Sequence, residues 1–306
     1  MSAGCWHAEV RNGGKHSDTL CNDRARAMIR AIGVLLLALG LAIGSIFLAT
    51  RAFNMALAMP SIAALDPALL ESLFDFAVFG LLALVAWIAL RVEKRKVALG
   101  RPLPGLGGIG LVLGIAGVGV ALVLSGIAGV SYRGAGHAPV LLAILAGMVA
   151  TLGQTAAEEY YFRGWLQPAL QAAWGRWPGI AVTAIGFAAV HFFAAAKEPL
   201  AFLNLVLAGL WLGVLANRSG GLMLPIAAHF GWNGAEELLF GAAPNPGVGS
   251  FGALFDFDLI GNPLWGGSAE GLNASLSTVF VLAALLAACA TWPVPLVRRG
   301  RKFAFG

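Results

Sequence analysis

Three short groups of polar and ionisable residues interrupt long apolar runs of the sequence. Side chains four positions apart lie on the same face of a helix, and each group contains such a pair. Ionisable side chains within apolar segments are energetically costly and are usually functional. The groups are Glu158-Glu159 with Arg163, Phe187 with His191, and His229 with Asn233.

Helical spacing separates the two adjacent glutamates. Glu159 and Arg163 can pair, in the carboxylate-first order that stabilises a helix. Glu158 is turned about 100° away from that pair and remains free to act on another molecule. The rise of ~1.5 Å per residue places Glu158, both histidines and Asn233 roughly 12–18 Å from the cytoplasmic ends of their apolar segments. We therefore expect these four side chains to meet at one depth.

A carboxylate, two imidazoles and a carboxamide at one depth suit the water-mediated hydrolysis of an amide bond. Glu158 would take a proton from water, as a general base does. His191 would help to hold and polarise that water. His229 and Asn233 would donate hydrogen bonds to the oxyanion that develops on the substrate carbonyl.

The remaining polar residues of these segments are predicted to have other roles. Glu159 and Arg163 form a structural pair, and Phe187 alone is a core residue. Glu236 and Glu237 come near the outer end of their segment, where we expect an interfacial position.

Other chemistries and functions are weighed against this one. One glutamate and two histidines are also a plausible zinc set, although no His-Glu-x-x-His helix is present. Membrane Glu and His residues also serve transporters and proton relays, but the sequence has no paired halves with matching broken helices. A non-catalytic membrane partner is a further alternative. No serine lies in a nucleophile position, because Ser219 is at a loop.

The composition indicates that lipid is the solvent for much of the chain. Of its 306 residues, 59% are hydrophobic and 11% are charged, against roughly 25% charged in a soluble domain. The net charge of +5 comes from short basic clusters between apolar runs, which indicates membrane topology rather than a nucleic-acid partner. The three cysteines give neither a disulfide framework nor metal spacing.

The apolar runs predict an all-α membrane protein with a bundle of about eight transmembrane helices, because a span needs about 20 apolar residues. Residues 28–297 would form one membrane domain between a cytoplasmic tail, 1–27, and a short basic tail, 298–306. The stretch 241–275 is the one long loop. The predicted spans are 28–50, 73–90, 109–130, 139–167, 179–196, 199–217, 221–240 and 276–297.

The distribution of basic residues tests this count independently. With these spans, 17 of the 20 Lys and Arg residues fall on one side of the membrane and only Arg51, Arg133 and Lys197 fall on the other. The positive-inside rule then places both termini in the cytoplasm and the loop 241–275 outside.

The third span is unusually rich in glycine. A nucleotide-binding loop is excluded, because no strand precedes these glycines and no Lys-Ser/Thr follows them. Small residues allow close helix packing in membranes, which is the interpretation we adopt. The glycines are Gly105, Gly107, Gly108, Gly110, Gly114, Gly117 and Gly119.

The three polar groups together resemble a known pattern, that of the CAAX protease and bacteriocin-processing family (also called Abi) of intramembrane glutamate proteases. The resemblance covers roughly residues 140–240. The family pattern is Glu-Glu-x-x-x-Arg, then Phe-x-x-x-His, then His-x-x-x-Asn or Asp, on separate helices. Here it is Glu158-Glu159…Arg163-Gly164, Phe187…His191 and His229…Asn233.

The resemblance implies an intramembrane endopeptidase that needs no metal or other cofactor. By it, Glu158 and His191 activate water, His229 and Asn233 stabilise the oxyanion, and other motif residues support the site. The substrate would be a membrane-associated protein or peptide, cut near its C-terminus or in a membrane segment. Family members include eukaryotic enzymes that trim prenylated C-terminal tripeptides, and bacterial proteins linked to peptide maturation or self-immunity. The Ala and Gly richness favours a bacterial cytoplasmic membrane.

Overall fold

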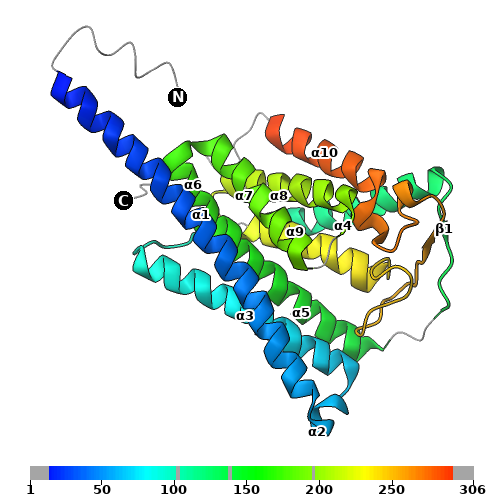
Figure 1. The fold of residues 1–306 in the computed structure, drawn as a ribbon. Helices are drawn as coiled ribbons and strands as arrows, with labels where there is room; N and C mark the ends of the chain where they lie inside the picture. The colour runs from blue at the N-terminus through cyan, green and yellow to red at the C-terminus, as the bar shows by residue number, and fades with distance from the viewer. Residues whose placement is uncertain (1–13, 101–103, 137–139, 195–196, 292–306) are drawn as a thin grey trace.

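Long apolar helices make up most of the computed structural model, which describes residues 14–100, 104–136, 140–194 and 197–291 (Figure 1). The long helices are α1 (Gly14–Leu57), α3 (Pro67–Val92), α4 (Pro104–Ile127), α5 (Leu141–Glu159), α7 (Arg176–Ala194), α8 (Pro199–Ser219), α9 (Met223–Gly234) and α10 (Leu276–Thr291). Shorter elements are α2 (Pro60–Ala63), α6 (Gln167–Trp174), the π-helices η1 (Tyr160–Leu166) and η2 (Ala235–Leu239), and the 3-10 helices η3 (Pro263–Trp265) and η4 (Gly271–Ala274).

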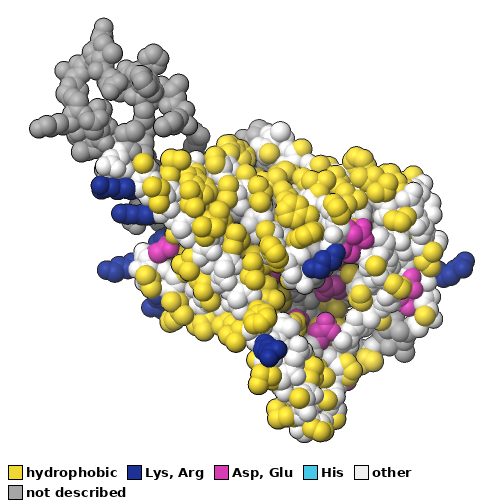
Figure 2. All heavy atoms as spheres, in the orientation of Figure 1, with side chains coloured by type: hydrophobic (Ala, Val, Ile, Leu, Met, Phe, Trp, Pro, Cys, Tyr) yellow, Lys and Arg dark blue, Asp and Glu magenta, His cyan; other side chains and the backbone are white. Residues whose placement is uncertain are grey.

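The chain is a multi-pass membrane protein. Six of the described helices are long and apolar enough to cross a membrane, and Leu276–Thr291 is a shorter apolar helix. Hydrophobic side chains cover most of the face drawn in Figure 2, as expected of a surface in contact with lipid. The predicted seventh and eighth spans correspond to residues 223–239 and to α10. The count of eight stays a prediction.

Two predicted boundaries differ from the observed helices. Helix α1 begins at Gly14, so half of the predicted tail 1–27 is helical. The predicted span 139–167 includes α5 and η1, and the chain then continues as α6 to Trp174. The tail 298–306 and the last part of the predicted span 276–297 lie outside the described residues.

Loops that were predicted to share one side of the membrane lie together. On the predicted cytoplasmic side, the carbonyl oxygens of Ala98 and Leu99 accept hydrogen bonds from the backbone of residues 222–223. On the predicted outer side, β1 (Ser131–Tyr132) pairs antiparallel with β2 (Leu259–Ile260) of the loop 241–275. The spatial grouping of the loops agrees with the basic-residue pattern, whereas the absolute orientation stays a prediction.

Close packing of α4 against α9 confirms the interpretation of the glycine-rich span. A Cβ atom at Gly114 would lie 2.3 Å from the carbonyl oxygen of Ala228, and one at Gly110 would lie 2.6 Å from that of Leu224. From the other helix, a Cβ at Gly231 would lie 2.5 Å from the carbonyl oxygen of Leu111. Only glycine allows backbones this close, so the contact fixes the position of α9, which carries His229.

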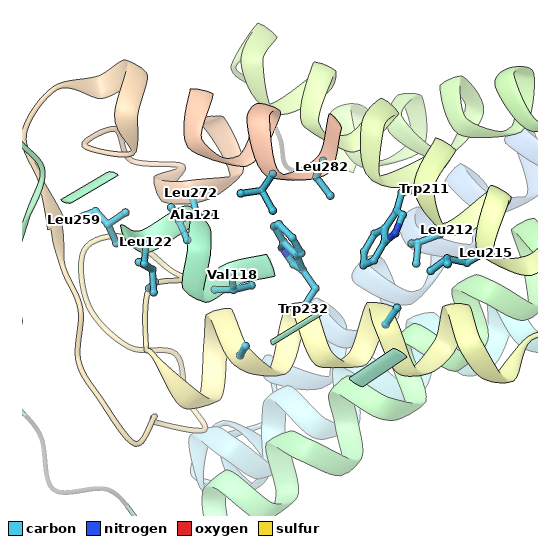
Figure 3. Packing of buried hydrophobic residues seen from close by; sticks show 14 of the residues in the cluster. Val118, Ala121, Leu122, Trp211, Leu212, Leu215, Trp232, Leu259, Leu272 and Leu282 are labelled. Carbon is cyan, nitrogen blue, oxygen red and sulfur yellow. The ribbon is translucent and has the colours of Figure 1, made fainter. Parts of the chain in front are cut away.

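Aromatic packing fixes α9 from its other side. Trp211 of α8 and Trp232 of α9 are buried, with ring centroids 6.3 Å apart in an edge-to-face arrangement. Edge-to-face pairs are favoured by the ring quadrupoles and bury large apolar areas. Figure 3 shows both indoles among Val118, Leu122 and Leu282, which come from α4 and α10.

The first prediction concerns topology. Reporter fusions in residues 241–275 should report an external position, and fusions in 91–100 a cytoplasmic one, because of the basic asymmetry. A C-terminal fusion should report the cytoplasm. An external C-terminus would contradict the predicted eight spans.

The second prediction concerns the α4–α9 contact. Gly114→Ala should lower the thermal stability of the purified protein by the equivalent of about 1–3 kcal/mol, as overpacking does. Gly119→Ala is the matched control, because nothing lies within 4 Å of a Cβ at that position. Equal melting temperatures for the two variants would show that the contact does not constrain α9.

Candidate active site

Glu158 and Glu159 are the last two residues of α5, at the point where the helix widens into the π-helix η1. Glu158 is 3% exposed and Glu159 is fully buried. π-Helical turns are uncommon and occur frequently at functional sites. The sequence predicted a helix here but gave no sign of the π-helix.

Two imidazoles from other helices face Glu158. The Nε2 atom of His191, on α7, lies 3.6 Å from Oε1 of Glu158. The Nε2 atom of His229, on α9, lies 3.6 Å from Oε2 of the same carboxylate. The structure thus brings together from three helices the carboxylate and the two imidazoles that the sequence predicted to meet.

The other ring nitrogen of each histidine has a fixed partner. Nδ1 of His191 lies 2.9 Å from the carbonyl oxygen of Phe187, and a carbonyl only accepts, so Nδ1 donates. Nδ1 of His229 lies 3.0 Å from Oε1 of Glu159 and donates to that carboxylate. Both rings therefore direct Nε2 at Glu158. When such a ring is neutral, its one N–H is at Nδ1, so Nε2 carries no proton.

Glu159 forms the predicted ion pair with Arg163. The Nη1 atom of Arg163 lies 2.8 Å from Oε1 of Glu159, and both side chains are fully buried. Nη2 of Arg163 donates to the carbonyl oxygen of Gly209 at 3.2 Å. Because Oε1 also accepts from His229, this one carboxylate oxygen joins the pair to the candidate site.

Phe187 lies between the ion pair and His191. Its ring is 4.7 Å from the guanidinium carbon of Arg163, a cation–π contact. Its centroid is 4.3 Å from that of His191. Phe187 is 2% exposed, and this packing holds the His191 ring in place, which gives the predicted core residue a positioning role.

A cavity of about 430 Å³ opens beside the two imidazoles and Asn233. The exposed fraction of the side chain is 29% for His191, 10% for His229 and 4% for Glu158. Glu158 therefore lies behind the imidazoles as seen from the cavity. The Asn233 carboxamide makes no hydrogen bond within the part of the chain that the structure describes, so its NH₂ group is available to a ligand.

Glu236 and Glu237 also line this cavity, so they lie inside the protein rather than on its lipid-facing surface, and their interfacial depth in the membrane stays a prediction. Glu236 is 4% exposed, and Glu237 is half-buried. Both lie on the π-helix η2, which follows α9 directly. The position of Glu236 and Glu237 in their apolar run does not reveal that they line a cavity, because the cavity wall forms only when α9 packs against α8 and the loop 241–275.

The long loop closes one end of the cavity. Residues 243–245 are among its lining. The Asn245 side chain donates to the carbonyl oxygens of Leu259 and Ser268 and accepts from the Leu259 backbone NH. These three bonds tie the loop into a fixed shape, so the segment between the last two helices belongs to the site.

The side chains of Glu158, His191 and His229 are of the types that bind zinc. Among the described residues, however, no group of three or more His, Cys, Asp or Glu side chains has an arrangement that could hold a metal ion.

Comparison with known families covers the same segment. Residues 137–235 match the family model described as "Type II CAAX prenyl endopeptidase Rce1-like". We call this matched segment the Rce1-like domain. The match confirms the resemblance seen in the sequence, and all seven motif residues lie within the Rce1-like domain. Searches of curated proteins and of solved structures gave no match.

The Rce1-like domain supports a coarse functional assignment. The family consists of CAAX proteases, so the chain is a multi-pass membrane protein with a segment similar to a protease family, which supports a protein or peptide as its substrate.

The third prediction concerns the buried ion pair. Glu159→Gln leaves the Arg163 guanidinium without its counter-charge, which should cost about 3–5 kcal/mol and lower the melting temperature. The matched control is Glu93→Gln, in the partly exposed pair with Arg95 at 2.9 Å, where we expect a cost below ~1 kcal/mol. Thermal unfolding of both purified variants makes the comparison. Equal losses would contradict the structural role of the buried pair.

Proposed function

We propose that the protein is an intramembrane endopeptidase in which Glu158 and His191 activate water and His229 and Asn233 stabilise the oxyanion. The observation that carries the proposal is the placement of the Glu158 carboxylate against the Nε2 atoms of both imidazoles, at 3.6 Å each. The Oε2 atom of Glu158 has no hydrogen-bond partner. A carboxylate with an unpartnered oxygen in the apolar interior of the Rce1-like domain has no evident structural role.

The water would lie against the edge formed by Glu158 and His191. From that position it donates one hydrogen to Oε1 of Glu158 and the other to the bare Nε2 of His191. Both lone pairs of the water oxygen then remain available for attack on a carbonyl carbon. The hydrogen bond from Nδ1 of His191 to Phe187 supports this role, because it leaves Nε2 as an acceptor.

The oxyanion requires donors on the other side of the cluster. Asn233 donates through its NH₂ group, whereas His229 donates at Nε2 only when both of its nitrogens carry protons. Contacts with two carboxylates, Glu159 at 3.0 Å and Glu158 at 3.6 Å, support the charged form of His229. With Arg163 included, two positive charges then balance two negative charges, which is the condition under which buried charges are tolerated.

The reaction balances without a cofactor. The water oxygen bonds to the carbonyl carbon as its proton passes to Glu158, and the carbonyl oxygen becomes the oxyanion. Collapse of this intermediate re-forms the C=O bond and breaks the C–N bond. Glu158 returns the proton to the leaving nitrogen, so that the products are a carboxylic acid and an amine.

The fourth prediction separates catalysis from folding. Glu158→Gln keeps the size of the side chain but removes the proton acceptor, so cleavage of a membrane-presented peptide should fall by roughly 10²–10⁴-fold or more. Asn233→Ala should slow turnover by roughly 10²–10³-fold, as loss of an oxyanion donor does. Thermal unfolding of the same preparations is the control. Wild-type cleavage by folded Glu158→Gln would exclude the proposed mechanism in favour of a relay or partner role.

The fifth prediction addresses the zinc alternative. Purified active protein should contain no stoichiometric metal, and its rate of peptide cleavage should be unchanged by chelators. Loss of activity on chelation, restored by added zinc, would instead assign Glu158, His191 and His229 as metal ligands.

A further inference from the structure

The wall of the cavity next to the candidate site is acidic. Glu236 and Glu237 line it from η2, and Glu270 lines it from the loop 241–275. No lysine or arginine is among the described residues that line it. Figure 2 shows acidic side chains around a hollow, with Lys or Arg side chains near its edge.

Neither Glu236 nor Glu237 forms an ion pair within the described residues. Glu270 is occupied, because its Oε1 atom accepts from the backbone NH groups of Lys197 and Glu198 at 2.6 and 3.0 Å. Oε1 of Glu236, by contrast, is buried without a hydrogen-bond partner. An unpartnered buried carboxylate oxygen is costly to the protein alone, and a cationic group bound in the cavity beside Glu236 would offset part of that cost.

Neighbouring helices increase the negative potential here. Glu237 lies within electrostatic range of Glu236, and of Asp75 and Glu71 on α3. In a site with little water, such a potential attracts a cationic group and repels a carboxylate.

The acidic wall adjoins the proposed reaction centre. Glu236 and Glu237 follow Asn233 by three and four positions, so they lie about one turn further along the same continuous helix. The π-helix begins between Asn233 and these carboxylates, at Ala235. A group bound by the wall therefore belongs to a residue close to the peptide bond that is cut.

The apolar part of the cavity lining suits the stem of a long side chain. Trp211, Leu212 and Trp232 supply apolar surface within the same cavity. The methylene stems of lysine and arginine pack on such surface while the charged end finds a polar partner. A volume of about 430 Å³ is in the range of small ligand pockets and leaves room for such a side chain.

We propose that Glu236 and Glu237 form a subsite for a lysine or arginine side chain of the substrate, close to the scissile bond, and that peptides presenting a carboxylate to this cavity are disfavoured. The inference rests on the proposed peptidase function and names its substrate class.

A peptide library tests the subsite through cleavage. Membrane-anchored peptides of mixed sequence, with acetylated N-termini and amidated C-termini, carry only side-chain charges. Mass spectrometry of the products formed by wild-type protein in liposomes should show Lys and Arg enriched at one position beside the cut bond. For the best peptide, replacing that residue by Glu should lower kcat/KM by about tenfold or more, since an unfavourable charge contact exceeds ~1.4 kcal/mol in this setting.

Charge-neutral variants assign the effect to the acidic wall. Glu237→Gln, at the half-buried position, should remove most of the preference for Lys over Gln at that position, with melting temperature unchanged. Glu236→Gln should act in the same direction. Glu198→Gln is the matched control, because it removes the same charge from a side chain that does not line the cavity, and it should keep the preference.

A binding measurement separates this inference from the proposed function. The same library is passed over immobilised Glu158→Gln protein, and retained peptides are sequenced. Enrichment of Lys and Arg among the retained peptides, lost in Glu158→Gln/Glu237→Gln, supports the subsite. This holds even if the wild type cleaves no peptide, because the absence of cleavage would contradict only the peptidase function. Cleavage without basic enrichment, or a preference unaffected by Glu237→Gln, would overturn the subsite and leave the peptidase function standing.

Discussion

The buried ion pair between Glu159 and Arg163 is the interaction on which the rest of the candidate site depends. Its shared oxygen, Oε1 of Glu159, also accepts from Nδ1 of His229 and thereby fixes how that ring faces Glu158. The guanidinium lies on the ring of Phe187, whose carbonyl oxygen orients His191. The salt bridge therefore holds the His229 ring directly and contacts His191 through Phe187. Oε2 of Glu158 and Oε2 of Glu159 are both buried without a hydrogen-bond partner.

Such a cluster is stable only where the surrounding helices hold it rigidly, because buried charges tolerate little misplacement. The close glycine contacts of α4 with α9, and the packing of Trp211 on Trp232, supply that rigidity on the His229 side. On the other side, η1 packs Tyr161 and Phe162 into a separate apolar core, and the Tyr161 hydroxyl donates to the carbonyl oxygen of Ala38 at 2.6 Å. The polar site thus lies between two apolar cores.

Much of this arrangement follows from local rules that a sequence exposes. Four-residue spacing is sufficient to pair Glu159 with Arg163, and apolar length is sufficient to predict the helices. The bond between His229 and Glu159 joins residues 70 positions apart, so no local pattern predicts it. The π-helices, and the burial of Glu236 in a cavity wall, likewise arise from packing between helices. These features change the interpretation of the site most, since they decide which nitrogen faces Glu158 and what lines the cavity.

We propose that the Glu159–Arg163 pair fixes the protonation pattern of the two histidines. Nitrogen-15 NMR of histidine-labelled protein in lipid bilayers measures that pattern directly, with His191→Gln and His229→Gln assigning the signals. We expect a neutral His191 protonated at Nδ1 and a His229 protonated at both nitrogens, with the second proton of His229 lost in Glu159→Gln. A neutral His229 in the wild type, or a His191 protonated at Nε2 alone, would contradict this pattern.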